Sequence, residues 1–484
     1  MPRKSTESLG NKTSLFDCTN WRTVVYLVYV FSLCKDRCVF AATAPHTTGD
    51  HKARPNMIWQ FFYNNLIVPL MWCVFHIGGI FNDKIRRGIR GRRNLLRNIT
   101  SEVEQLPSSD RIWFHSSSMG EFEQAKPIIA AIKKINPDIA IIATFFSPSG
   151  LEHSKNYKLA NIISYLPFDS HKQANAFVDI VRPTAVVMVR YDVWPNILWA
   201  LKERDIPTMI ANATMKKNSP RKILFARQFH RSLYDCLSYI LTVSNSDRLS
   251  FDDFKLSHPV VESIGDTRFD QVNMRRDEAA KKHILPDQIV EGKKVFVVGQ
   301  SWDADDNVVL PVVFKLQESM PDLLTILVPH EPTIEHLEQV EYRLEGRTSF
   351  IRFSEMNQYN NEKVILIDSV GVLFPLYRYA HIAYVGGSFR QGIHNVLEPA
   401  AFSLPVLYGP KHTNSQEAIA LANSGGGFVV EDERDLYRIL RALLGNEAKR
   451  IEAGKKARQL VEQNLGATER FLKYVMPLLS HSSK

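Results

Sequence analysis

The chain has 484 residues, 45% of them hydrophobic and 23% charged, which is an ordinary composition for a globular protein of two or three domains. The formal net charge of +9 is modest for this length, so the sequence does not predict a nucleic-acid-binding protein. The 5 cysteines lack the spacing of a zinc site or a disulfide framework, and no histidine pair stands with a carboxylate at helical spacing. We therefore expect no metal and no bound cofactor.

Residues 1–56 show little regular patterning. Within them Val24–Cys34 is apolar but short for a membrane span, and charged residues flank it. This run fits a signal-like segment or a marginal anchor. A third interpretation, which we favour, is that translation begins at Met57 and that residues 1–56 are a leader or extension foreign to the native protein.

The segment 57–100 combines an apolar stretch with a basic one. Leu66–Phe81 is apolar except for His76, and aromatic residues precede it. Seven lysines and arginines follow between residues 84 and 97. This order is typical of an interfacial or barely spanning membrane anchor whose basic part contacts anionic lipids on the cytoplasmic side. The alternative is an amphipathic helix packed on its own domain.

From about residue 108 the sequence alternates short apolar runs with helical patterns. Continuous apolar strands between helices predict a parallel sheet covered on both faces, and hence a doubly wound α/β domain over 108–270. The expected strands are Arg111–His115, Ala140–Phe145, Ile162–Leu166, Ala185–Val189, Thr208–Ala211 and Tyr239–Val243, with helices at Gln124–Ile135 and Trp194–Glu203.

A second series of the same kind predicts another doubly wound domain over 285–465, after a charged linker with a helix at Arg275–Lys293. Residues 466–484 hold a last helix, Glu469–Leu479, which is expected to cross back to the first domain or to the membrane. Two such domains predict a ligand cleft beyond the carboxyl ends of their strands. The expected strands are Val295–Gly299, Leu324–Val328, Val364–Ile367, His381–Val385 and Pro405–Leu407.

A glycine-rich turn follows one strand of the second domain. The strand runs into Gly386, Gly387 and Ser388, and a helix is expected to open at Asn395. The two glycines allow a ligand to approach the backbone, and the helix N-terminus can bind a phosphate. Glu398, one turn into that helix, can accept hydrogen bonds from a ribose. Asn395 and Glu398 also fit a capping box, which needs no ligand, so both interpretations stay open.

Polar residues follow the first strand of the first domain. Ser117, Ser118 and Gly120 at a helix N-terminus can bind an anion, and Glu121 can take a proton from an acceptor hydroxyl. Acidic residues are also common in a first helical turn without any ligand, and Glu123 is a rival for the same role.

Charged residues stand in two further loops. After the fourth strand, Arg190 is expected as a cation facing the ligand or as the ion-pair partner of Asp192, and Asp192 is expected to cap the next helix. In the second domain, His330 can act as a base or as a donor to a phosphate. A structural role is the commoner one for a histidine judged on sequence alone.

These loops belong to a longer series of motifs. The series comprises Trp113–Glu121, Thr144–Gly150, Tyr165–Asp169, Val193–Asn196, Asn212-Ala213, Val385–Ser388, His394–Ala400 and Val406–Pro410. In its order and spacing it resembles the 3-deoxy-D-manno-octulosonic acid (Kdo) transferases of lipopolysaccharide synthesis. The resemblance covers about residues 57–478, and the motifs are specific together although each one alone is weak.

The resemblance implies a two-domain glycosyltransferase of the GT-B type, anchored in the inner membrane with its catalytic domains on the cytoplasmic face. It implies transfer of Kdo from CMP-Kdo to a lipid A precursor (lipid IVA), with inversion and without a metal. Glu121 matches the family's proposed base. Positions implied for donor binding are Pro329, His330, Val370, Gly371, Val372, Gly387, Ser388, Asn395, Val396, Leu397 and Glu398. Further donor or acceptor contacts are expected at Ser117, Ser118, Gly120, Arg190, Asp192 and Asn212.

Three residues depart from the family's pattern. His330 stands where many members have an arginine, Arg190 where an acidic residue is usual, and Thr214 where many have an arginine. These departures leave open which groups contact the phosphate or the Kdo carboxylate, and Arg190 is a candidate for such a contact. The alternatives are another GT-B transferase or a sugar-nucleotide epimerase with a UDP donor, and a non-catalytic, membrane-tethered nucleotide-sugar binder.

Overall fold

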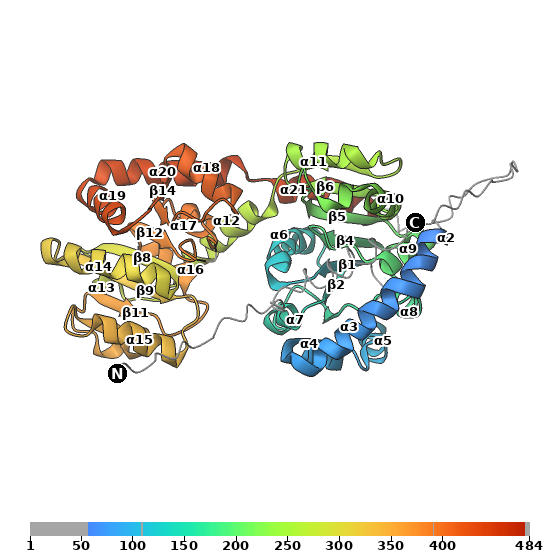
Figure 1. The fold of residues 1–484 in the computed structure, drawn as a ribbon, viewed down its shortest axis with the longest axis horizontal. Helices are drawn as coiled ribbons and strands as arrows, with labels where there is room; N and C mark the ends of the chain where they lie inside the picture. The colour runs from blue at the N-terminus through green and yellow to red at the C-terminus, as the bar shows by residue number, and fades with distance from the viewer. Residues whose placement is uncertain (1–56, 108–109, 391, 480–484) are drawn as a thin grey trace, which may run out of the picture. The chain divides into compact units, whose positions relative to one another are not determined.

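Two parallel sheets organise the chain in a computed structural model that describes residues 57–107, 110–390 and 392–479 (Figure 1). Among the described residues, the first sheet belongs to a unit of residues 57–125, Ile132–Ile264 and residues 473–479, and the second to a unit of Lys126–Ala131 and Gly265–Leu472. The two-sheet α/β class predicted from the sequence is confirmed. The expected leader 1–56, with Val24–Cys34, lies outside the described residues.

The first sheet has the strand order β3-β2-β1-β4-β5-β6-β7, with all neighbours parallel. Six of its strands were predicted with bounds that differ by at most two residues. The edge strand β7 was missed because its burial pattern is mostly exposed, so no apolar run marks it. The strands are β1 Arg111–Ser116, β2 Ala140–Phe145, β3 Ile162–Tyr165, β4 Ala185–Val189, β5 Thr208–Ala213, β6 Tyr239–Thr242 and β7 Val260–Ser263.

The second sheet has the order β10-β11-β9-β8-β12-β13-β14 and is also parallel throughout. The predicted strands again lie within two residues of those observed. The edge strands β10 and β14 were missed because only one of the three residues in each is buried, whereas β11 and β13 are equally short but fully buried. The strands are β8 Lys294–Ser301, β9 Leu323–Pro329, β10 Phe350–Arg352, β11 Val364–Leu366, β12 Ile382–Val385, β13 Val406–Tyr408 and β14 Gly427–Val429.

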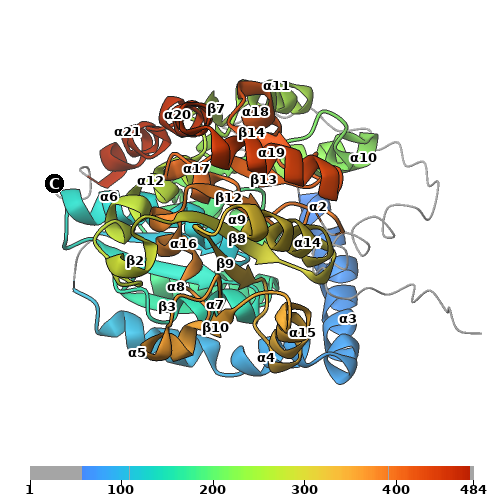
Figure 2. The same cartoon turned by 90° about the vertical axis from the view of Figure 1, so that its left-hand side faces the viewer.

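Helices cover both sheets, and in the second unit α14 packs against α19 (Figure 2). Helices of the first unit are α2 Met57–Phe62, η1 Tyr63–Ile67, α3 Val68–Phe81, α4 Asp83–Gly91, α5 Leu95–Glu104, α7 Pro148–Ser154, α8 His171–Val181, α9 Pro195–Glu203, η2 Pro220–Lys222, α10 Leu224–Tyr234, α11 Asn245–Phe251 and η3 Asp252–Phe254. Those of the second are α12 Thr267–Ala279, α13 Asp287–Val290, α14 Asp303–Ser319, α15 Ile334–Leu344, η4 Phe353–Gln358, α16 Leu373–Leu376, η5 Tyr377–Tyr379, α17 Leu397–Ala401, α18 Gln416–Ser424, α19 Glu433–Gly445 and α20 Glu447–Gln463. The helices α6 Met119–Ile135 and α21 Ala467–Leu479 have residues in both units.

The expected linker and the last helix are both parts of folded units. Leu285 and Ile289, which lie within the expected linker Arg275–Lys293, are buried in a core of the second unit, so the prediction of a linker over these residues is wrong. The end of α21 belongs to the first unit, as one of the two expectations held, and there Tyr474 donates a hydrogen bond to Glu262.

The apolar segment at the start of the described chain packs on the first unit. The helices α2, η1 and α3 follow one another without a break. Tyr63, Met71 and Phe75 on one side of this segment are buried in the unit's core, and the Tyr63 ring contacts Trp199 at 5.7 Å between centroids. The side of the segment that carries these residues therefore packs on its own domain, as the alternative interpretation of an amphipathic helix predicts.

Asp169 ties that segment to α9. The carboxylate is fully buried and accepts hydrogen bonds from Tyr63 Oη at 2.7 Å, from Asn196 N at 3.2 Å and from Ile197 N at 3.1 Å. Burial raises the pKa of Asp169 to about 6, although these hydrogen bonds lower it. The folded state therefore binds a proton at this carboxyl more tightly than the unfolded state does.

We expect Asp169 to make unfolding pH-dependent. Its contribution to stability is fully present below the ordinary pKa of 3.8 and is lost as the pH rises through about 6. The loss amounts to roughly 3 kcal/mol of unfolding free energy. Urea unfolding between pH 4 and 7 measures it, and Asp169→Asn should remove this part of the slope. The exposed Asp205→Asn variant serves as control, and an unchanged slope in Asp169→Asn would refute the assignment.

Candidate active site

Each sheet has one point where the strand order reverses, which we call its switch point. In the first sheet β2 and β3 lie to one side of β1 and β4 to the other, and in the second sheet β9 and β12 flank β8 in the same way. Ligands of open parallel sheets bind beyond the carboxyl ends of the strands at such points. The loops singled out in the sequence follow β1 and β4 in the first unit, and β8, β9 and β12 in the second.

At the first switch point, α6 begins directly after β1. Ser118 is its N-cap, and Glu121 Oε2 accepts hydrogen bonds from Ser118 N at 3.0 Å and Ser118 Oγ at 3.1 Å. The structural alternative, an acidic residue that serves the first turn, is thus realised, and Glu121 is only 1% exposed. A Cβ at the exposed Gly120 would meet no atom within 4 Å, so packing inside the protein does not require this glycine.

Two other predicted residues lie around α6. Ser117 is half-buried and its carbonyl accepts a hydrogen bond from Ser147 N at 2.9 Å. Asn212, buried at the end of β5, donates from Nδ2 to Gln124 Oε1 of α6 at 3.2 Å. The contacts of Ser117 and Asn212 therefore fix the β1 loop and α6 in place.

Arg190 and Asp192, in the loop after β4, carry polar atoms without partners. Arg190 has a φ of 69°, a left-handed conformation that costs a residue with a side chain about 1–2 kcal/mol. Arg190 Nε and Asp192 Oδ2 are buried, and neither forms a hydrogen bond in the described part of the chain. The predicted cap is wrong, because Trp194 is the N-cap of α9, and no ion pair joins Arg190 to Asp192 among the described residues. Buried polar atoms without partners in a strained loop are typical of a functional site.

His115 supports this switch point and was not predicted. The ring is fully buried, its Nε2 accepts a hydrogen bond from Trp194 Nε1 at 3.0 Å, and its Nδ1 lies 3.0 Å from Thr144 Oγ1. Burial lowers the pKa of His115 to about 4, although the Asp192 carboxylate opposes this. The imidazole is therefore neutral at pH 7 and connects β1 to α9. The sequence signal was present, because His115 and Trp194 both lie in the motif series.

In the second unit, packing explains the glycine pair after β12. A Cβ at Gly386 would lie 2.2 Å from the Gln300 carbonyl oxygen, and Gly387 has a φ of 93°. Ser388 is buried and its Oγ accepts a hydrogen bond from Gly409 N at 2.6 Å. The packing and backbone conformation of the turn therefore account for all three residues without a ligand.

Three aromatic rings stack at the second switch point. Trp302 follows β8, His330 follows β9 and His394 follows β12. The Trp302 and His330 centroids are 4.5 Å apart, and those of His330 and His394 are 4.4 Å apart with an interplanar angle of 15°. Trp302 Nε1 also donates to His394 Nε2 at 3.0 Å. Sequence reasoning found His330 but missed its two partners, because the three residues are far apart in the chain.

The two histidines of this stack favour the neutral form. Burial lowers the pKa of His394 to about 4, and it also lowers that of His330, which the neighbouring Glu331 carboxylate opposes. His330 Nδ1 is buried and has no hydrogen-bond partner in the described structure. Both rings therefore offer hydrogen bonds rather than full positive charges at pH 7.

The helix after the glycine turn begins later than predicted. It begins at Leu397 rather than Asn395, and Asn395 Oδ1 accepts a hydrogen bond from Leu397 N at 3.1 Å. The predicted capping box is wrong because Val396, not Asn395, is the N-cap, and Glu398 Oε1 pairs with Arg275 Nη1 at 3.1 Å. The side chains of Val396 and Leu397 are buried in the core of the second unit.

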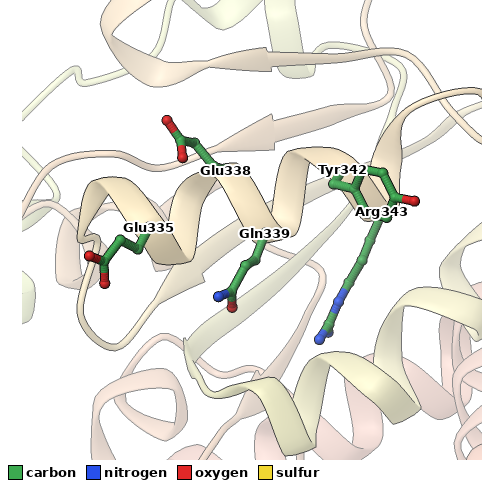
Figure 3. A pocket seen from close by; sticks show the side chains of 5 residues that line it. All are labelled: Glu335, Glu338, Gln339, Tyr342 and Arg343. Atoms are coloured by element: carbon green, nitrogen blue, oxygen red, sulfur yellow. The ribbon is translucent and has the colours of Figure 1, made fainter.

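Of the remaining predicted positions, Pro329 ends β9 and is buried, whereas Val370 and Gly371 are exposed and Val372 half-buried. A surface hollow along α15 offers no second set of converging groups (Figure 3). Its lining comes from this one helix, namely Glu335, Glu338, Gln339, Tyr342 and Arg343.

Comparison with known proteins places these features in a family. A family model described as 3-deoxy-D-manno-octulosonic-acid transferase (kdotransferase) matches residues 87–271. The 3-deoxy-D-manno-octulosonic acid transferase of Haemophilus influenzae is 28% identical over 435 residues, which cover 88% of this chain and 100% of the relative. That of Aquifex aeolicus is 28% identical over 366 residues, which cover 75% of this chain and 94% of the relative.

Solved structures show the fold independently. The UDP-GlcNAc 2-epimerase of Neisseria meningitidis superposes with a TM-score of 0.56 at 13% identity, over 76% of this chain and 100% of that one. At this identity the likeness shows a GT-B-like fold and nothing about the substrate. The curated relatives, in contrast, are alike in sequence across both units. The family model and the curated relatives together support a Kdo transferase, which is a glycosyltransferase, and the solved structures show a GT-B-like fold.

Proposed function

We propose that the protein transfers Kdo from CMP-Kdo to a lipid A precursor such as lipid IVA, with inversion and without a metal ion at the reacting atoms. The observation that carries the proposal is the pair of switch points in a chain of this family. One presents the hydrogen-bonded Glu121 carboxylate together with buried atoms of Arg190 and Asp192 that have no partner among the described residues, and the other presents three stacked rings. These are the groups needed to activate an acceptor hydroxyl and to hold a nucleotide leaving group.

Glu121 is the proposed base. The two hydrogen bonds from Ser118 hold its carboxylate at the first turn of α6, and a positioned base contributes about 10²- to 10⁴-fold to a rate. Once deprotonated, the acceptor hydroxyl attacks the anomeric carbon from the face opposite the departing CMP. One base is enough for such an inverting transfer, and no sugar–enzyme bond forms.

The stack of Trp302, His330 and His394 is the proposed donor site. Its rings offer flat faces for stacking, and His330 Nδ1 is a buried hydrogen-bonding atom without a partner in the part of the chain that the structure describes. A neutral imidazole can donate a hydrogen bond to a phosphate oxygen, which supports His330 as the replacement for the family's usual arginine. The remaining predicted donor positions, Val370 to Val372 and Asn395 to Glu398, stay proposals.

Arg190 and Asp192 are the proposed polar contacts for Kdo or the acceptor. Arg190 replaces an acidic residue of the family, and its guanidinium offers a positive charge at the first switch point for an anionic sugar. A ligand carboxylate there would satisfy the buried Nε. The strained conformation of Arg190 would then serve to place its guanidinium against the ligand.

We propose that the membrane contact is interfacial and lies on the cytoplasmic face of the inner membrane. The segment Met57–Phe81 is long and apolar enough to cross a membrane. However, the side that carries Tyr63, Met71 and Phe75 is buried in the first unit, so this segment cannot offer all its sides to lipid. The opposite side exposes Phe61, Leu66, Trp72, Ile80 and Phe81, and the region around the start of α10 exposes Ile223, Leu224 and Phe225. One apolar face on lipid and one on protein is typical of an interfacial helix.

Only part of the basic segment is available to lipid head groups. Arg92 is held inside by hydrogen bonds to Leu166 O at 2.8 Å and Phe146 O at 2.7 Å, and Arg87 pairs with Glu152. Arg90, Arg93 and Arg97 are exposed and form no ion pair among the described residues. These three are the proposed contacts for anionic head groups.

A transfer assay tests the proposal. Membranes that contain the protein are incubated with CMP-Kdo, a tetra-acylated lipid A precursor and EDTA, and mass spectrometry counts the Kdo units added. We expect a mass increase of one or more units. An unchanged precursor, with EDTA and equally with Mg²⁺, would overturn the proposal.

A further inference from the structure

The first turn of α14 holds two adjacent buried carboxylates that differ in their hydrogen bonding. Asp305 accepts hydrogen bonds from Trp302 N at 3.0 Å, Gly387 N at 2.8 Å and Tyr384 Oη at 2.8 Å. Asp306 has a side chain that is 0% exposed, yet neither of its oxygens has a hydrogen-bond partner in the described structure. The helix N-terminus favours acidic residues in general, but it does not explain a fully buried carboxylate without a donor.

A histidine from the next helix faces this carboxylate. His336 Nε2, in the first turn of α15, lies 3.7 Å from Asp306 Oδ2, and His336 Nδ1 lies 3.7 Å from Asp303 Oδ1. Both distances are too long for hydrogen bonds, and Nε2 is itself buried without a partner. One ligand atom from each of the three residues can be chosen so that all lie within 4.8 Å of one another.

We propose that Asp303, Asp306 and His336 bind a divalent transition-metal cation, best fitted by Zn²⁺, that joins α14 to α15. A cation would supply the partner that the Asp306 oxygens and His336 Nε2 lack. Zinc–ligand bonds are about 2.0–2.2 Å long, so the ligand atoms must close to about 3–4 Å from one another. Asp303 has a side chain that is 56% exposed and is free to rotate by this amount.

The ligand set decides which cation fits. Imidazole nitrogen with two carboxylates suits Zn²⁺ and its first-row neighbours, whereas Mg²⁺ and Ca²⁺ prefer oxygen alone. The competing arrangement is an ion pair of protonated His336 with Asp306. The Asp306 carboxylate raises the pKa of His336, and the Arg343 guanidinium opposes this. An ion pair would still leave Asp306 Oδ1 without a partner, which is why we prefer the cation.

The site is separate from the groups proposed for transfer. Neither Glu121 nor the rings of Trp302, His330 and His394 is among its ligands, so the inference does not rest on the proposed function. We expect EDTA to lower the thermal stability of the protein without abolishing Kdo transfer at 25 °C.

The experiment compares full-length protein, purified in EDTA and then freed of it, at pH 7.5 with and without added Zn²⁺. We expect Zn²⁺ at about 100 times its Kd to raise the Tm by about 5 °C. Co²⁺ should bind with one equivalent and give a visible absorption spectrum. The variants Asp306→Asn and His336→Gln should lose the Tm rise and this spectrum.

Glu335→Gln is the matched control. Glu335 precedes His336 in the chain and is exposed, and its substitution removes a negative charge, as Asp306→Asn does, without removing a ligand. This variant should respond to Zn²⁺ as the wild type does. If His336→Gln fails to fold, Asp303→Asn, which changes an exposed residue, provides the same comparison. No Tm rise in the wild type, or an equal rise in His336→Gln and Asp303→Asn, would overturn the proposal.

Discussion

Replacing Glu121 by Gln is expected to lower the rate of Kdo transfer by about 10²- to 10⁴-fold, which is the contribution of a positioned general base. The amide oxygen of Gln can still accept the hydrogen bond from Ser118 N, so α6 keeps its start. CMP binding should stay unchanged, because the proposed donor site is in the other unit. Mass spectrometry of the lipid product gives the rate, and isothermal titration gives the affinity for CMP.

The control for this prediction is Glu123→Gln. Glu123 lies two residues further along α6 and is the rival that the sequence could not separate from Glu121. The Glu123→Gln variant should keep a rate of Kdo transfer within a few-fold of wild type. A Glu121→Gln variant with wild-type activity would remove Glu121 as the base, and a collapse in Glu123→Gln alone would assign the role to Glu123.

Replacing Arg190 by Gly should lower transfer by about 10²- to 10³-fold, the typical cost of losing one charge-stabilising donor. Stability should stay within about 1 kcal/mol of wild type, because glycine accepts the φ of 69° and offsets its own entropic cost. The guanidinium Nε that is buried without a partner also disappears. Thermal unfolding and the transfer assay on the same samples measure both effects.

Lys255→Gly is the matched control for Arg190→Gly. Lys255 is also basic, has a φ of 48° and belongs to the same unit, but it is exposed and follows η3 rather than a strand of the switch point. It should change stability similarly and leave transfer unaltered. If Arg190→Gly unfolds readily, Arg190 is a structural residue, and if it retains full transfer, no substrate contact depends on it.

The interior of both sheets could be predicted from the sequence because each central strand is apolar on both faces. Ala185–Val189, for example, is buried at every residue, and its predicted bounds are those observed. The edge strands β7, β10 and β14 could not be found in this way. They are short or exposed, and hydrogen bonds to a neighbouring strand define them rather than their side chains.

The residues of the candidate site could be predicted where they all lie in one loop. They could not be predicted where they come from loops that are far apart in the chain. The helix start at Ser118 and Glu121 is local, so the sequence indicated both its capping and its catalytic interpretation. The stack of Trp302, His330 and His394 unites three loops, and the pair of Asp306 and His336 unites two helices. Such contacts depend on strand order, which no local pattern encodes.

We propose CMP-Kdo as the donor, rather than a UDP-sugar such as the one bound by an epimerase of the same fold. One reaction that contains the protein, a lipid A precursor, CMP-Kdo and UDP-GlcNAc in equal amounts tests this claim, with chromatography of all nucleotides over time. We expect CMP to appear in step with Kdo on the lipid while UDP-GlcNAc stays intact. Conversion of UDP-GlcNAc to another product, with CMP-Kdo unused, would contradict CMP-Kdo as the donor.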